Sequence, residues 1–189
     1  QIKVEDDQKF VAGTGNDLGA KPGDFATFSL SIKNIGNGDT QYSVSCTSPN
    51  QWLIDIAGSG SSSLILDPLS RLQFLPLPIS VRVPDVAGGQ PAAGVSEDVT
   101  CVTPSVQDST ITKSDMATVT VFESLDFSVD LFDDENNVLG ALAIADDRPV
   151  LNGNLSKTRV IVTNEGNVPM DFTMSVSSSL SSWQVELVD

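Results

Sequence analysis

Cys46 and Cys101 are the side chains in this sequence with an obvious covalent chemistry, because the chain has no further cysteine and no histidine. Without histidine, the commonest general base and the commonest transition-metal ligand are missing. A hydrolytic triad of the usual kind is therefore impossible, and two thiolates alone do not make a zinc site. Two carboxylates could still act on a glycoside, but no pattern places two acids across a cleft. We therefore predict a protein that is not an enzyme.

Oxygen-rich acidic runs are the remaining candidates for a ligand site. The longest, at 133–137, reads Asp-Asp-Glu-Asn-Asn, and calcium prefers oxygen ligands. This run lacks the alternating ligands and central glycine of the twelve-residue calcium loop, so a solvated hairpin turn is the competing interpretation. If a cofactor is present at all it is calcium, and Asp133 and Asp134 are expected to hold it.

Two further features could involve carbohydrate. Asn154 begins the single N-glycosylation sequon, Asn-Leu-Ser, at a turn before a strand, where an acceptor must be exposed; so short a motif also occurs by chance. Exposed indoles of Trp52 and Trp183 could stack on sugar rings. Their equivalent places in two alternating strands instead favour burial of each indole within its own domain.

The charge of the chain limits its partners. The formal net charge is −15, from 25 acidic and 10 basic side chains. A field of this sign repels nucleic acid and anionic lipid, so we expect neither as a partner. No stretch reaches the ~20 apolar residues that a membrane helix needs, and we predict no membrane insertion in this segment. The first residues are strand-like and show no signal peptide, which for a secreted protein would have been removed or lie upstream.

An internal repeat organises the chain. Residues 22–37 match residues 152–167 at a constant offset of 130, and each copy contains an alternating strand followed by the motif Asn-x-Gly-Asn. The later matches are Tyr42 to Cys46 with Phe172 to Val176 and, after a one-residue insertion, Trp52 to Ile56 with Trp183 to Leu187. Apolar residues alternate with period two in each block, which is typical of half-buried antiparallel strands. A repeat of this length built from short strands predicts tandem sandwich domains.

About seven strands are predicted in the first repeat, as an immunoglobulin-like sandwich needs. Pro76 and Pro78 predict an edge or irregular start to the strand at 75–83. The weakly structured stretches are expected at 13–19, 58–63 and 87–94. The predicted fold class is therefore all-β: tandem immunoglobulin-like β-sandwich domains, the first at 1–123 and the second at 124–189.

The second domain is expected to be incomplete. By analogy with the first repeat, about three strands are missing after the tryptophan strand. Either the sequence is a fragment of a longer chain, or another chain supplies the missing strands. Between the two repeats only Glu123 and Ser124 are left over, which favours a stiff end-to-end arrangement.

Within this fold the two cysteines fall on inward-facing strand positions. In immunoglobulin-like order their strands are neighbours in one sheet. An oxidising environment would favour a Cys46–Cys101 disulfide. The alternative is a pair of buried reduced thiols that pack as small apolar side chains.

The order of these features resembles a known group of domains. The order is Pro22-Gly23-Asp24, an alternating strand, Asn-x-Gly-Asn, a second strand, a tryptophan, and then 77–84 before Ala87-Gly88. This order is similar to that of the NPCBM-associated and cell-adhesion-related (CARDB-like) immunoglobulin-like domains of archaeal and bacterial surface proteins. The resemblance covers 21–122 and part of 152–187. It implies extracellular or cell-envelope repeats that serve as stalks, spacers or adhesive modules, with no catalytic residues.

The partners implied are other surface-protein domains or copies of the chain itself. The competing hypothesis is an accessory polysaccharide-binding domain of a secreted hydrolase. A row of aromatic side chains on an exposed sheet face would favour that second function.

Overall fold

The computed structural model describes residues 2–5, 17–87, 90–132, 158–178, 182 and 184–187. These ranges contain strands and no helix. The strands are β1 (Ile2–Glu5), β2 (Asp17–Ala20), β3 (Phe25–Lys33), β4 (Ser43–Thr47), β5 (Leu53–Ile56), β6 (Ser63–Ile65), β7 (Phe74–Arg82), β8 (Ser96–Pro104), β9 (Thr112–Val121), β10 (Phe127–Phe132) and β11 (Arg159–Asn164). We call β1 to β9 with their connections the first unit, and β10 and β11 with the turn that follows β11 the second unit.

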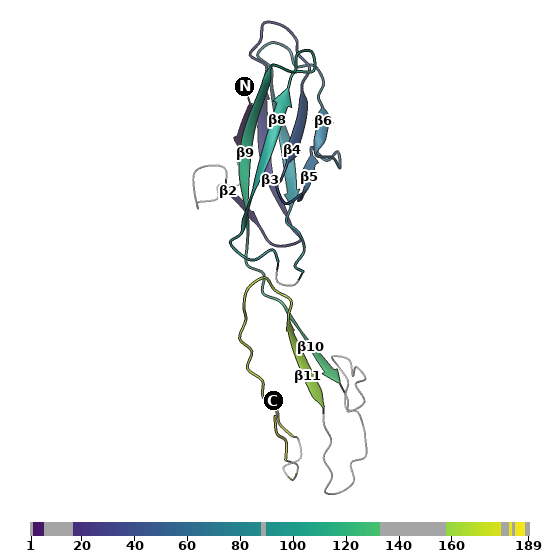
Figure 1. Ribbon diagram of the computed structural model, residues 1–189, viewed down its shortest axis with the longest axis vertical. Coiled ribbons are helices and arrows are strands. Elements are labelled where there is room, and N and C mark those ends of the chain that lie inside the picture. Colours follow the sequence, from purple (N-terminus) through teal and green to yellow (C-terminus); the bar gives the residue numbers. More distant parts are fainter. Residues whose placement is uncertain are drawn as a thin grey trace.

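The first unit is a sandwich of two sheets (Figure 1). One sheet has the order β1-β3-β7-β5, and the other has the order β2-β9-β8-β4-β6. If β1, β3, β4, β5, β7, β8 and β9 are lettered A to G in chain order, the sheets become A-B-E-D and G-F-C, which is the arrangement of an immunoglobulin constant-type domain. Strands β2 and β6 are additions at the two edges of the second sheet. The predicted all-β, immunoglobulin-like fold is therefore confirmed for this unit.

The core lies between the two sheets and is filled by alternate residues of each strand. Along β3 the burial pattern alternates as the sequence predicted, because one face of the sheet is covered by the other sheet. The largest fully buried side chains are Phe28, Leu30, Ile32, Val44, Ile56, Ile79, Val81, Val83, Val99, Val119 and Val121. Trp52, which is 8% exposed, joins this cluster, so its predicted burial is confirmed. Trp183 lies outside the described residues.

Strand β2 is an element that the sequence did not predict. The stretch 13–19 was expected to be weakly structured, and this is wrong for Asp17 to Gly19, because β2 pairs in parallel with the edge of β9. Gly19 fits this pairing for a steric reason. A Cβ atom at that position would lie 2.0 Å from the Cζ atom of Phe122, so the ring of Phe122 packs directly against the backbone of β2.

Pro76 and Pro78 lie in the part of β7 that has a neighbouring strand on only one side. β7 pairs with β3 along its whole length, whereas β5 covers only Ile79 to Arg82. The carbonyl oxygen of Pro78 accepts a hydrogen bond from the amide of Ala57 at 2.8 Å, so it points away from β3. Since a residue's N and O point to the same side of a strand, both prolines place their missing N–H on that outer edge. The prediction of an edge-like start to this strand is confirmed.

The second unit repeats the first pair of strands. β10 pairs antiparallel with β11, as β1 does with β3. The strand predicted at 172–176 is not formed, and that prediction is wrong. Phe172, Met174 and Val176 are 40%, 52% and 45% exposed. An alternating apolar segment becomes a half-buried strand only against an opposing sheet, and the described residues of this unit provide none.

Candidate functional site

The structure contains the predicted disulfide between Cys46 and Cys101. The two residues face each other directly in the register of β4 and β8, with their Cα atoms 4.0 Å apart. Both side chains are almost completely buried, at 1% and 0% exposure. The bond therefore links neighbouring strands of one sheet from the core side. It is a structural crosslink, because solvent-borne thiols cannot reach it in the folded unit.

Glu97 is a buried carboxylate that the sequence analysis did not single out. It lies on β8 and is 2% exposed. One oxygen accepts hydrogen bonds from the Ser48 hydroxyl and from the Asn50 amide at 2.7 Å, and the other accepts from Asn50 Nδ2 at 2.6 Å. Ser48 Oγ in turn accepts from the amide of Trp52 at 3.0 Å. The carboxylate thus holds the loop that delivers Trp52 to the core, and it has no free oxygen facing a cleft.

A second ionisable group, Asp108, lies in a surface turn. The side chain and the backbone amide of Thr110 donate hydrogen bonds to Asp108 Oδ1 at 2.7 and 3.0 Å. These hydrogen bonds lower the pKa of Asp108 below its ordinary value of 3.8 because they stabilise the charged form. The group is fully exposed, so it is part of a turn and not of a catalytic pocket.

The Asn-x-Gly-Asn motifs form the same turn in both units. In the first unit, Asn34 Nδ2 donates to the carbonyl of Gly38 and Asn34 Oδ1 accepts from the amide of Gly36, at 2.8 and 2.9 Å. In the second, Asn164 makes the equivalent bonds to Val168 and Gly166 at the same distances. The offset of 130 residues seen in the sequence is therefore reproduced bond by bond in the structure.

The second of these turns closes onto the segment that joins the two units, Phe122–Asp126, which we call the connecting segment. Asn167 is 5% exposed. Its Oδ1 accepts from the amide of Ser124 at 2.7 Å, and its Nδ2 donates to the carbonyl of Phe122 at 2.9 Å. Its backbone amide donates to the carbonyl of Ser124 at 3.1 Å, and its own carbonyl accepts from the amide of Ala93 at 3.3 Å. Asn167 thus ties the turn of the second unit to the connecting segment through its side chain and to the first unit through its backbone carbonyl.

The neighbouring residues of this turn tighten the same contact. The amides of Glu165 and Gly166 both donate to the carbonyl of Asp126, at 2.9 and 3.0 Å. Gly166 is buried, and a Cβ atom there would lie 2.4 Å from the carbonyl oxygen of Ser124. Glycine is therefore required because another backbone approaches too closely for any side chain. We call this set of contacts the joint. Figure 1 shows the β10–β11 pair extending beyond the end of the sandwich at which β9 finishes.

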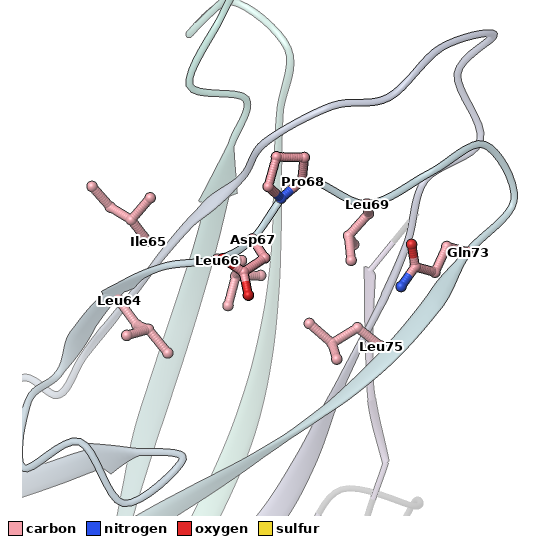
Figure 2. A pocket seen from close by; sticks show the side chains of 8 residues that line it. All are labelled: Leu64, Ile65, Leu66, Asp67, Pro68, Leu69, Gln73 and Leu75. Atoms are coloured by element: carbon pink, nitrogen blue, oxygen red, sulfur yellow. The ribbon is translucent and has the colours of Figure 1, made fainter.

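A surface hollow of about 330 Å³ lies at the edge of the sandwich between β6 and β7. Figure 2 shows the side chains that line it: Leu64, Ile65, Leu66, Asp67, Pro68, Leu69, Gln73 and Leu75. Ligand sites combine an apolar lining with several convergent polar groups. Here the Oε1 atom of Gln73 already accepts from the amide of Ser70 at 2.8 Å, which leaves the Nε2 amide group of Gln73 and the Asp67 carboxylate as the polar side-chain groups. The hollow therefore has no catalytic constellation.

The other predicted site residues fall outside the described part of the chain. Asp133, Asp134 and Asn154 are among them, so the calcium and glycosylation predictions stay predictions. Within the ranges that are described, no three His, Cys, Asp or Glu side chains gather where they could hold a metal ion. The same ranges contain no helix long and apolar enough to cross a membrane.

Among the described residues of the first unit, the exposed aromatic side chains do not form a row. Phe25 and Phe74 are 54% and 51% exposed. Phe25 begins β3, whereas Phe74 pairs with Lys33 at the other end of that strand. A sugar-binding platform needs aromatic faces side by side, and these two rings lie at opposite ends of the sheet.

No family model matches the chain, and no curated protein matches it in sequence. Solved structures give distant likenesses. An ASH/PapD-like domain of human CEP192 is 10% identical, with a TM-score of 0.35, over 65% of this chain and 86% of that one. Self-complemented MyfA, the major subunit of Myf fimbriae from Yersinia enterocolitica, is 15% identical, with a TM-score of 0.40, over 65% and 99%.

A third likeness is to the alkylpurine DNA glycosylase AlkC of Pseudomonas fluorescens, bound to DNA containing an abasic site analog. It is 9% identical, with a TM-score of 0.34, over 64% of this chain and 30% of that one. Likenesses this weak say nothing about activity or partners. The fold is established by the strand order of the chain itself.

Proposed function

We propose that this chain is a non-catalytic structural module of an extracellular or cell-envelope protein, in which immunoglobulin-like units are joined end to end by a stiff, hydrogen-bonded joint. The units would be of the NPCBM-associated or cell-adhesion-related kind, with the first at 1–123 and an incomplete second at 124–189. The observation that carries the proposal is Asn167, a buried side chain whose hydrogen bonds all serve the connection between units.

The chemistry of the described residues supports a structural role. The buried carboxylate, Glu97, is fully used in holding a loop, and the buried sulfur atoms form a crosslink. Disulfides persist in oxidising compartments, which agrees with a location outside the cytoplasm. A module of this kind acts through its length and stiffness, because it positions whatever is attached to its two ends.

The joint gives that stiffness a physical basis. A connecting segment without fixed contacts would leave the units free to reorient. Here the Asn167 side chain satisfies one donor and one acceptor of the segment, at Ser124 and Phe122. Leaving each of these two groups without its partner costs about 1–3 kcal/mol, so the loss of both is enough to shift a two-state joint toward an open form by roughly tenfold or more.

Amide hydrogen exchange tests this proposal with a matched pair of variants. Asn167→Ala should speed exchange of the Ser124 amide by about tenfold or more. Asn37→Ala changes the equivalent residue of the first unit, which makes no hydrogen bond to the connecting segment, and should leave that rate unchanged. Equal exchange at Ser124 in the natural chain and in Asn167→Ala would show that the joint does not hold the units.

A further inference from the structure

Asn37 occupies in the first unit the place that Asn167 occupies in the second. Both follow the same hydrogen-bonded Asn-x-Gly turn. Asn167 is buried at 5% exposure, whereas Asn37 is exposed. Among the described residues no side-chain partner of Asn37 is found. The two turns are alike in conformation and differ in what covers them.

The register of the first strand pair shows where a covering segment would lie. In the second unit Phe127, which directly follows the connecting segment, is opposite Asn164. In the first unit Ile2 is opposite Ile32. Because the strands are antiparallel, the position opposite Asn34 is the one immediately before Gln1. Residues entering β1 from that direction would cross the Gly36–Asn37 turn as the connecting segment crosses the turn at Gly166.

The surroundings of Gly166 and Gly36 agree with this path for a segment entering β1. At Gly166 an added Cβ would lie 2.4 Å from the Ser124 carbonyl and 3.0 Å from the Asp126 amide. At Gly36 the nearest atom is Oδ1 of Asn34 at 3.1 Å, followed by the Gly38 carbonyl at 4.0 Å. The first turn therefore keeps an open approach in the direction that the connecting segment fills in the second.

We propose that the turn formed by Asn34–Asn37 is a docking site for the connecting segment of a preceding immunoglobulin-like unit of the same polypeptide. Asn37 Oδ1 would accept a hydrogen bond from a backbone amide, and Asn37 Nδ2 would donate one to a backbone carbonyl, as the side chain of Asn167 does. The chain would then be an interior link of an array in which each joint is built by the same residues. This inference rests on the proposed structural function and identifies its partner.

A duplicated chain tests the docking site. Residues 1–127 are placed directly before the complete 189-residue sequence, so that Phe127 of the leading copy precedes Gln1 of the second. The leading copy carries Asn37→Ala, so that only the second copy gives an Asn37 amide signal in nuclear magnetic resonance. Exchange of the Asn37 amide is expected to be about tenfold or more slower in the duplicated chain than in the natural chain.

Two variants of the second copy separate docking from nonspecific shielding. Gly36→Ala should abolish the slowing, because its Cβ would meet the incoming backbone. Asp39→Ala, at an exposed residue of the same loop, should leave the slowing in place.

Equal Asn37 exchange in natural and duplicated chains would overturn the inference, as would slowing that survives Gly36→Ala. Slowing in the natural chain that grows with concentration would assign the occupant to a second molecule and also overturn it. The Asn167→Ala experiment is independent of all these results, so failure here is distinguishable from failure of the proposed function.

Discussion

Reduction of the Cys46–Cys101 disulfide should lower the stability of the first unit strongly. The bond closes a loop of 55 residues in sequence separation. In the chain-entropy model a loop of this length restricts the unfolded chain by about 14 cal/mol/K, which is about 4 kcal/mol at 25 °C. Whole domains are stable by only about 5–15 kcal/mol. Reduction therefore removes a large fraction of the total and should bring the unit close to its unfolding threshold.

The burial of the sulfur atoms separates the effect of losing the crosslink from any effect on core packing. The two cysteines are 1% and 0% exposed, and reduced thiols pack as small apolar side chains. Reducing the natural chain thus leaves the core nearly filled, whereas replacement by alanine would add the cost of a cavity. Most of the loss should come from the greater freedom of the unfolded chain.

Urea unfolding of the oxidised and the reduced protein measures the effect. Free energies extrapolated to water should differ by about 4 kcal/mol. Thiol titration in denaturant provides the control, with two free thiols per chain after reduction. A difference below ~1 kcal/mol would refute the reasoning. So would two titratable thiols in the untreated protein, because the crosslink would then be absent.

Two further predictions concern carboxylates. Glu97→Gln should lower the free energy of unfolding by about 1–3 kcal/mol, because an amide nitrogen would face the Asn50 donors. The control variant Asp98→Asn, at the exposed neighbour on β8, should change this free energy by no more than about 0.5 kcal/mol. Equal losses in the two variants by urea unfolding would contradict the role of Glu97. Asp108 should titrate below 3.8, and Thr110→Val should raise its pKa toward that value. Because the folded pKa is lowered, the stabilisation is present above the ordinary pKa and is lost as pH falls through the folded value. Carbon-detected titration of the Asp108 carboxyl checks this, and an unchanged midpoint in Thr110→Val would contradict it.

The period-two alternation was sufficient to predict most strands of the first unit and their immunoglobulin-like order. It failed at Asp17–Ala20, where the short segment is a strand only because it pairs with β9. It also failed at 172–176, where the alternation is present but no opposing sheet is described. Secondary structure that depends on a distant partner cannot be derived from a local pattern.

Some of the functional residues were likewise predictable from the sequence, and others were not. The disulfide was predictable because both cysteines follow the inward period of their strands. Glu97 could have been found by the same signal, since it shares the inward face of β8 with Val99 and Cys101. The role of Asn167 was not predictable, because Asn-x-Gly-Asn indicates a turn and contains no information about what docks on it.

A stiff structural module requires that the joint holds the two units in one orientation. Residual dipolar couplings measured on the natural chain in a weakly aligning medium test this directly. Couplings from β3, β7, β8 and β9 should fit the same alignment tensor as those from β10 and β11 together with the Asn164–Asn167 turn. A tensor of much smaller magnitude for β10, β11 and that turn would show that the units reorient freely, and it would contradict a stiff structural module.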